Sequence, residues 1–167
     1  STENWLRPHD EVDALMGLLE HYLAAEQAKM MRYGIRLLAI GDRSRLPGNV
    51  RTILEKVIEE TRENQRMTVI LALSYSGRDE IVRMAKELAI QARERKIDAH
   101  EIDEQTVAAH LDTGGVPDPD LLIRTSGELR ISNFLLWQIA YAEIWVTETL
   151  WPDFDKRHLY EAIIAFQ

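Results

Sequence analysis

The feature that most constrains the fold is the alternation of helix-like segments with short apolar runs. Apolar residues recur at helical spacing over 9–33, 47–63, 77–89 and 155–167, and shorter helices are expected over 102–111 and 132–141. Strands are expected over 35–40, 67–73, 121–124 and 143–147, the run 67–73 being apolar enough for burial on both faces. This alternation predicts one α/β domain over 1–167, with an open, mostly parallel sheet and helices on both faces.

Composition excludes several classes of protein and site. The 167 residues are 46% hydrophobic and 29% charged, the usual balance of a globular domain. The absence of cysteine excludes disulfide scaffolds, thiolate zinc sites and cysteine nucleophiles. A formal net charge of −8 argues against a large footprint for nucleic acid. No apolar run approaches the roughly 20 residues that span a bilayer, and no signal peptide opens the sequence, so we expect a cytoplasmic protein.

Arginines and small hydroxyl residues gather where the predicted strands end, at the edge where open α/β sheets bind ligands. The richest segment follows the strand 121–124 and contains Arg124, Arg130 and Ser132, with Ser132 as the expected N-cap of the helix over 132–141. A guanidinium fork suits phosphate oxygens, and a helix N-terminus offers free N–H groups to an anion. The segment indicates a pyrophosphate site, unless these arginines pair with Glu128 and Asp120 on a solvated rim.

Two other groups of residues have both a functional and a structural interpretation. Asn4, Trp5 and Arg7 precede the first helix, either as a loop that contacts substrate or as a hydrophobic staple with a surface arginine. Glu143 opens an apolar strand, where a carboxylate needs water, an arginine or a cation such as Mg²⁺. The apolar stripe of the helix over 9–33 is either core or the lining of a tunnel for an apolar substrate.

Common catalytic signatures are absent. The sequence has no Walker loop and no Gly-x-Gly-x-x-Gly, which disfavours P-loop and standard dinucleotide enzymes. The histidines show no metal-ligand spacing, and Ser126 does not lie in the Gly-x-Ser-x-Gly elbow of a serine hydrolase.

Several motifs together resemble the cis-prenyltransferase family, which includes the undecaprenyl diphosphate synthases. Residues 1–8 read Ser-Thr-Glu-Asn-Trp-Leu-Arg-Pro, and residues 118–128 read Asp-Pro-Asp-Leu-Leu-Ile-Arg-Thr-Ser-Gly-Glu. Residues 130–138 continue with Arg-Ile-Ser-Asn-Phe-Leu-Leu-Trp-Gln. The segments 40–42, 77–81, 141–143 and 150–154 also match, and all the blocks follow the family's order.

The resemblance implies an enzyme that condenses isopentenyl diphosphate onto an allylic diphosphate and forms a cis double bond at each step. Farnesyl diphosphate is the expected primer, and a polyprenyl diphosphate of the undecaprenyl type, a cell-wall lipid carrier, is the expected product. The resemblance also implies Mg²⁺ as cofactor, a homodimer, transient contact with a membrane, and an apolar tunnel for the growing chain.

Residue roles are carried over by motif. Ser1 and Asn4 would act as catalytic residues near proton removal, while Trp5 and Arg7 would bind the allylic substrate, with Arg7 on its phosphate.

The second substrate has its own set of residues. Arg124, Arg130 and Ser132 would hold the diphosphate of isopentenyl diphosphate. Glu143 would help place Mg²⁺ or orient this site near the dimer interface.

The sequence also departs from the family pattern. It lacks the Asp-Gly-Asn-Gly-Arg block, whose Asp is the principal ligand of Mg²⁺ and diphosphate, together with the first strand and a C-terminal Arg-x-Gly. Ser74-Tyr75-Ser76-Gly77 stands where the family has Asn-Tyr-Gly-Gly. We therefore expect a segment truncated at both ends and inactive alone. The alternative is a non-catalytic partner subunit of a heterodimeric cis-prenyltransferase, against which the intact Arg130-Ile131-Ser132-Asn133 argues.

Overall fold

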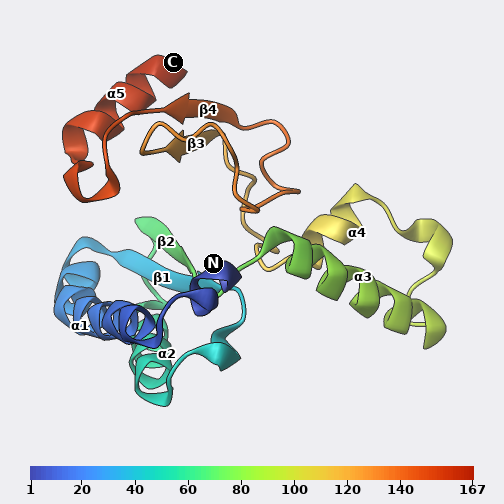
Figure 1. Cartoon of the computed structure of the whole chain (residues 1–167). Coiled ribbons are helices and arrows are strands. Elements are labelled where there is room, and N and C mark those ends of the chain that lie inside the picture. The colour runs from blue at the N-terminus through green and yellow to red at the C-terminus, as the bar shows by residue number, and fades with distance from the viewer. The chain divides into compact units, whose positions relative to one another are not determined.

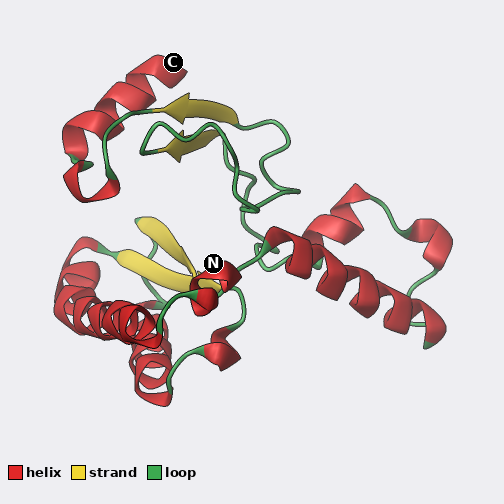
Figure 2. Ribbon diagram, viewed as in Figure 1, coloured by secondary structure: helices red, strands yellow, loops and turns green.

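The computed structural model describes residues 1–167. Its helices are α1 (His9–Tyr33), α2 (Gly48–Thr61), α3 (Gly77–Arg93), α4 (Glu104–Ala109) and α5 (Lys156–Phe166) (Figure 1). Its strands are β1 (Ile35–Ile40), β2 (Met67–Ala72), β3 (Leu121–Arg124) and β4 (Glu143–Val146) (Figure 2). Four short 3-10 helices complete the regular structure: η1 (Thr2–Leu6), η2 (Arg43–Arg45), η3 (Ala99–Glu101) and η4 (Trp151–Asp153).

The chain divides into two compact units, unit 1 over residues 1–76 and unit 2 over residues 77–167. Each unit contains one parallel pair of strands, β1 with β2 and β3 with β4. Leu37 is opposite Val69 in the first pair, and Leu121 is opposite Glu143 in the second. The predicted parallel α/β fold is confirmed, with one two-stranded ladder in each unit. A single domain over the whole chain stays a prediction.

Unit 1 has a hydrophobic core between its ladder and its two long helices. Leu37 of β1 is fully buried and packs in one cluster with Leu23 of α1 and with Leu54 and Val57 of α2. Burying a side chain of this size stabilises the fold by roughly 1.5–3 kcal/mol. α1 ends at Tyr33, the predicted bound, and its C-cap Gly34 has the left-handed conformation with φ 67°. The core thus fixes the positions of β1, α1 and α2 within unit 1.

Strand β2 is more exposed than its apolar sequence predicts. Met67 is 51% exposed, and no residue of β2 is fully buried. The prediction of burial on both faces is wrong for unit 1, because α1 and α2 both pack with the same face of the ladder around Leu37.

Unit 2 contains a helical part and a strand part. Met84 and Leu88 of α3 pack against Leu111, which follows α4. α5 contacts β4 and begins at the N-cap Asp155, as the sequence predicts. No helix in the chain is both long enough and apolar enough to span a membrane.

The predicted helix over 132–141 is absent, and this stretch is a series of turns between β3 and β4 (Figure 2). Ser132, Asn133 and Leu135 have φ angles of 55°, 60° and 47°. Three residues in the left-handed region cannot belong to a right-handed helix. The assignment of Ser132 as a helix N-cap is therefore wrong, and no helix N-terminus at this position contributes to an anion site.

Candidate functional site

Two groups of predicted site residues lie in different units. The first group surrounds a pocket of about 220 Å³ in unit 1. Ser1, Asn4 and Trp5 from the N-terminal segment line this pocket. The other lining residues belong to α1, to the C-cap of η2 and to the end of β2 with the two residues after it: Val12, Leu15, Met16, Leu19, Leu46, Ala72, Leu73 and Ser74. Most of the lining side chains are aliphatic, so the pocket suits an apolar ligand, and Ser1, Asn4 and Ser74 add polar groups to its lining.

Local hydrogen bonds hold the N-terminal segment at this pocket. The Ser1 hydroxyl accepts from the backbone N–H of Glu3 at 3.1 Å and caps η1. The backbone N–H of Thr2 donates to the carbonyl of Tyr75 at 3.1 Å. These contacts tie η1 to the segment that follows β2.

Trp5 lines the pocket and also packs against the hydrophobic core of unit 1. Its indole N–H donates to the Ser74 hydroxyl at 2.8 Å, and the Arg45 guanidinium lies 5.3 Å from its ring centroid. A cation over an indole face is attracted by the ring quadrupole. Sequence reasoning missed Ser74 and Arg45 as neighbours of Trp5, although both follow strand ends, the place where ligands bind in such folds.

Arg7 does not line this pocket. Its guanidinium pairs with Glu11 at 3.4 Å, and both side chains are more than half exposed. A surface ion pair of this kind contributes little free energy to stability. Arg7 can therefore exchange Glu11 for a more highly charged anion with little loss of stability.

The second group lies in unit 2, where β3 ends. Arg124 Nη2 donates to the Ser132 hydroxyl at 3.1 Å, so two of the predicted diphosphate ligands are in direct contact. The Nε atom of Arg124 is buried and has no hydrogen-bond partner in the chain. A buried charged donor without an acceptor is costly, which indicates a site that an anion would complete.

Arg130 lies on the same loop, and its side chain forms an ion pair with Glu128. Its guanidinium makes two contacts to the Glu128 carboxylate, at 2.9 and 3.1 Å, and its side chain is 74% exposed. The alternative interpretation, an arginine paired with an acid on a solvated rim, therefore describes the Arg130–Glu128 pair. It does not describe Arg124, for which no acidic partner is found.

Backbone donors contribute less to this site than the sequence suggested. The N–H groups of Ser126 and Gly127 donate to the carbonyls of Thr149 and Thr147, at 3.0 and 2.9 Å. These donors are occupied by the turn that leads out of β4. The structure brings Arg124 and Ser132 together as a candidate anion site, and the part of Arg130 in it stays a prediction.

Glu143 lies apart from these residues within the chain. It is opposite Leu121, whereas Arg124 is opposite Val146. The two positions are three residues apart along the ladder, about 10 Å, and alternation places their side chains on opposite faces. Glu143 is exposed, so water satisfies its carboxylate.

The chain does not form a complete magnesium site. No group of three or more His, Cys, Asp or Glu side chains is arranged to hold a metal ion. Mg²⁺ takes six oxygen ligands, commonly one or two carboxylates with substrate phosphates and water. The exposed carboxylate of Glu143 could supply one of these ligands, and its role toward Mg²⁺ stays a prediction.

The geometry can be compared with known proteins. The whole chain, residues 1–167, matches the prenyltransferase family described as undecaprenyl diphosphate synthase. The chain belongs to this family. Relatives named isoprenyl transferase from Heliobacterium mobile and Porphyromonas gingivalis are each 53% identical to it, over 100% and 98% of the chain. The chain spans 64% of the length of each of these two prenyltransferases.

Solved structures of prenyltransferases are also similar. The lavandulyl diphosphate synthase of Lavandula x intermedia, in complex with dimethylallyl diphosphate, is 36% identical with a TM-score of 0.96. The match covers 99% of this chain and 72% of that one. A probable undecaprenyl diphosphate synthase from Campylobacter jejuni is 42% identical with a TM-score of 0.85, over 99% and 75% of the two chains. The family resemblance read from the motifs is confirmed.

Proposed function

We propose that the chain carries the substrate-binding part of a cis-prenyltransferase that condenses isopentenyl diphosphate with an allylic diphosphate. The observation that carries this proposal is the loop after β3, where Arg124 touches Ser132 and keeps a buried donor without an acceptor. A diphosphate supplies that acceptor, and Arg130 exchanges the half-buried Glu128 for the more highly charged phosphate oxygens.

The pocket of unit 1 suits the other substrate. Its aliphatic lining suits a prenyl chain, and Ser1 and Asn4 contribute polar groups to the lining. The structure of the lavandulyl diphosphate synthase contains dimethylallyl diphosphate, an allylic diphosphate. That ligand supports an allylic diphosphate as a substrate of this chain, and we propose farnesyl diphosphate as the primer.

The reaction breaks the allylic C–O bond, and its electron pair leaves with the diphosphate. The double bond of isopentenyl diphosphate supplies the electrons of the new C–C bond, and loss of one proton forms the new cis double bond. The chain's own groups act by neutralising diphosphate charge, with Arg124, Arg130 and Ser132 on isopentenyl diphosphate and Arg7 on the allylic one. Ser1 and Asn4 are the candidates to accept or relay the proton.

The remaining elements of the proposal go beyond these residues. The product is a long-chain polyprenyl diphosphate of the undecaprenyl type, and the protein works as a homodimer with Mg²⁺ as a counter-ion for diphosphate. Because the sequence lacks the Asp-Gly-Asn-Gly-Arg block of the family, we expect the 167-residue chain alone to bind substrate without turning it over.

Ligand mapping by nuclear magnetic resonance tests the proposal. In isotopically labelled protein, isopentenyl diphosphate is expected to shift the amides of 124–133, whereas farnesyl diphosphate shifts the Trp5 indole N–H and the amides of η1. Inorganic sulfate at the same ionic strength is the control for general anion effects. Shifts from isopentenyl diphosphate that spare 124–133, or that sulfate reproduces, would contradict the proposed site.

A further inference from the structure

The loop that carries Arg130 and Ser132 is fastened to the start of α3 by Asn133. The backbone N–H of Gly77 donates to the Asn133 carbonyl at 2.9 Å, and that of Arg78 donates to the Asn133 side-chain Oδ1, also at 2.9 Å. The first N–H groups of a helix have no partner within the helix. Asn133 therefore supplies two acceptors to α3 from a distant segment, and we name this pair of contacts the Asn133 cap.

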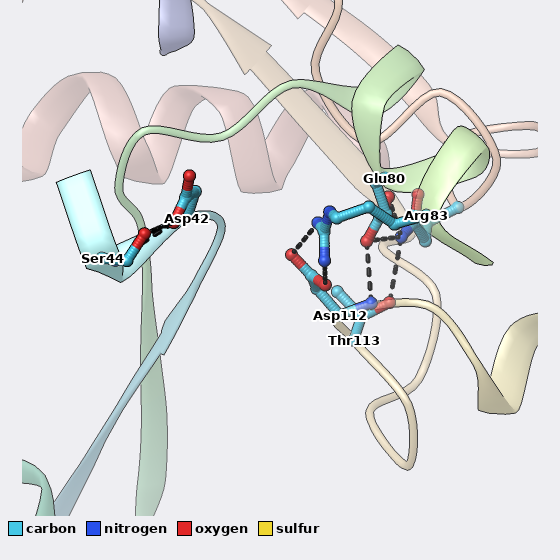
Figure 3. Close-up of polar contacts among 7 residues, drawn as sticks. Asp42, Ser44, Glu80, Arg83, Asp112 and Thr113 are labelled. Carbon is cyan, nitrogen blue, oxygen red and sulfur yellow. Dashed lines mark hydrogen bonds and ion pairs between the residues drawn. The ribbon is translucent and has the colours of Figure 1, made fainter. Parts of the chain in front are cut away.

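A second attachment lies at the other end of the same turns. The buried amide of Gln138 donates to the Glu80 carboxylate at 3.2 Å and to the Thr113 hydroxyl at 3.0 Å. Glu80 is 1% exposed and also accepts from the backbone N–H of Asp112 at 2.8 Å (Figure 3). A buried carboxylate that accepts several hydrogen bonds holds its donors firmly. The segment 133–138 is thus held to α3 at both ends.

Gly77 shows how closely this segment approaches the helix. A Cβ atom at Gly77 would lie 2.8 Å from Leu136 Cγ and 3.1 Å from the Asn133 carbonyl oxygen. These distances are shorter than carbon contacts of about 3.5–4.0 Å. Any side chain at this position would push the segment away from α3.

The backbone next to the cap is strained. Ser132 and Asn133 adopt φ angles of 55° and 60°, and Ser132 presents its hydroxyl to Arg124. Left-handed conformations cost non-glycine residues free energy and persist where surrounding contacts enforce them. The Asn133 cap is the contact adjacent to Ser132 that can enforce this conformation.

We propose that Asn133 is a positioning residue for the diphosphate site, acting through Ser132 and Arg130 rather than by touching the substrate. The proposal rests on the proposed function, because its consequence is the affinity for isopentenyl diphosphate. Loss of the cap lets the loop leave the conformation that places the Ser132 hydroxyl beside Arg124.

Two substitutions disturb the cap without changing any proposed ligand of diphosphate. Asn133→Gly removes the Oδ1 acceptor but tolerates the positive φ angle, and Gly77→Ala pushes the segment outward. Gly48→Ala is the matched control, because a Cβ atom at this first position of α2 would meet nothing within 4 Å. Asn133→Asp keeps an oxygen acceptor and serves as the conservative variant.

The experiment measures hydrogen exchange of the Arg78 amide and calorimetric binding of isopentenyl diphosphate by the 167-residue chain. We expect Asn133→Gly and Gly77→Ala to speed exchange at Arg78 and weaken binding by about tenfold, the equivalent of one hydrogen bond. Gly48→Ala should match the wild type in both readouts. Asn133→Asp should restore protection of Arg78 and bind more tightly than Asn133→Gly.

The outcomes separate the two proposals. If the wild type binds in a manner that Arg130→Ala abolishes, but Asn133→Gly binds equally well, the positioning role is wrong and the proposed function stands. A lower unfolding temperature with unchanged affinity would likewise reduce Asn133 to a structural role. If the folded wild type does not bind isopentenyl diphosphate, both proposals are overturned.

Discussion

Thr61 places a hydroxyl group inside the core of unit 1. It is fully buried at the end of α2, where its Oγ1 accepts from the Leu37 N–H at 3.0 Å and donates to the Val57 carbonyl at 2.8 Å. A single side chain thereby connects β1 to α2 by a hydrogen bond. Buried polar groups are tolerated only when they are paired in this way.

Thr61→Val is expected to lower the free energy of unfolding by about 1–3 kcal/mol, because it leaves the buried Leu37 N–H without its acceptor. Thr52→Val is the matched control, since Thr52 lies in the same helix and donates to the Gly48 carbonyl at 2.9 Å, but is exposed. The control should change stability by no more than about 0.5 kcal/mol. Urea denaturation measures both, and equal effects would show that the Leu37 contact does not contribute.

The turn after β1 depends on a residue without a side chain. Gly41 has a φ angle of 94°, and a Cβ atom there would overlap the Leu73 carbonyl oxygen and lie 3.0 Å from Tyr75 Cα. The close approach brings the end of β1 against the segment after β2, which carries Ser74 of the pocket. We expect Gly41→Ala to destabilise unit 1 by about 2 kcal/mol or more.

Gly17 is the corresponding control within a helix. It lies inside α1, and a Cβ atom there would meet nothing within 4 Å. Gly17→Ala should raise the free energy of unfolding by about 1 kcal/mol, since alanine is the better helix former. Thermal unfolding of the two variants should give shifts of opposite sign, and a stabilising Gly41→Ala would contradict the close approach at Leu73.

At the scale of elements, α5 has a cap that depends on pH. The Asp155 carboxylate accepts from the backbone N–H groups of Arg157 and His158, at 2.9 and 3.4 Å. Hydrogen bonding from the Arg157 side chain, helped by these backbone donors, lowers the pKa of Asp155 from 3.8 to about 2. The charged form is thus favoured in the folded state.

A lowered pKa means that this stabilisation is present above the unfolded value of about 3.9 and is lost as pH falls toward 2. Asp155→Asn keeps an N-cap oxygen but no charge. We expect the wild type to have the higher unfolding temperature at neutral pH, and the difference to shrink as the pH decreases through this window. Circular dichroism melts at several pH values measure it, and a difference independent of pH would contradict the charged cap.

At the scale of the whole molecule, hydrophobic periodicity predicted those helices and strands whose bounds depend on residues within or next to them. α1, β1 and β3 have the predicted bounds, because the apolar spacing that predicts them is local to these segments, and Gly34 and Gly41 follow directly after α1 and β1. The motif blocks predicted the family, which the match over 1–167 confirms.

Features that depend on distant partners could not be predicted. The apolar spacing over 132–141 is typical of a helix, yet Asn133 and Gln138 bind α3 and its neighbouring turns, which lie far away in the sequence. The separation of Glu143 from Arg124 follows from the register of β3 and β4, for which the sequence carries no local signal. The roles of the candidate site residues therefore stay predictions, and the backbone that carries them could not be predicted from local patterns.

The central claim is that Arg130 helps this chain bind isopentenyl diphosphate. Arg157 offers a matched control, because it is 76% exposed and pairs with an acid two residues earlier at 2.9 Å, as the 74% exposed Arg130 does. Calorimetric titration of isopentenyl diphosphate should compare the wild type, Arg130→Ala and Arg157→Ala, with circular dichroism to verify folding. Wild-type binding that is lost in Arg130→Ala and retained in Arg157→Ala is the predicted result. Equal binding by all three folded proteins, or binding by none, would contradict the account.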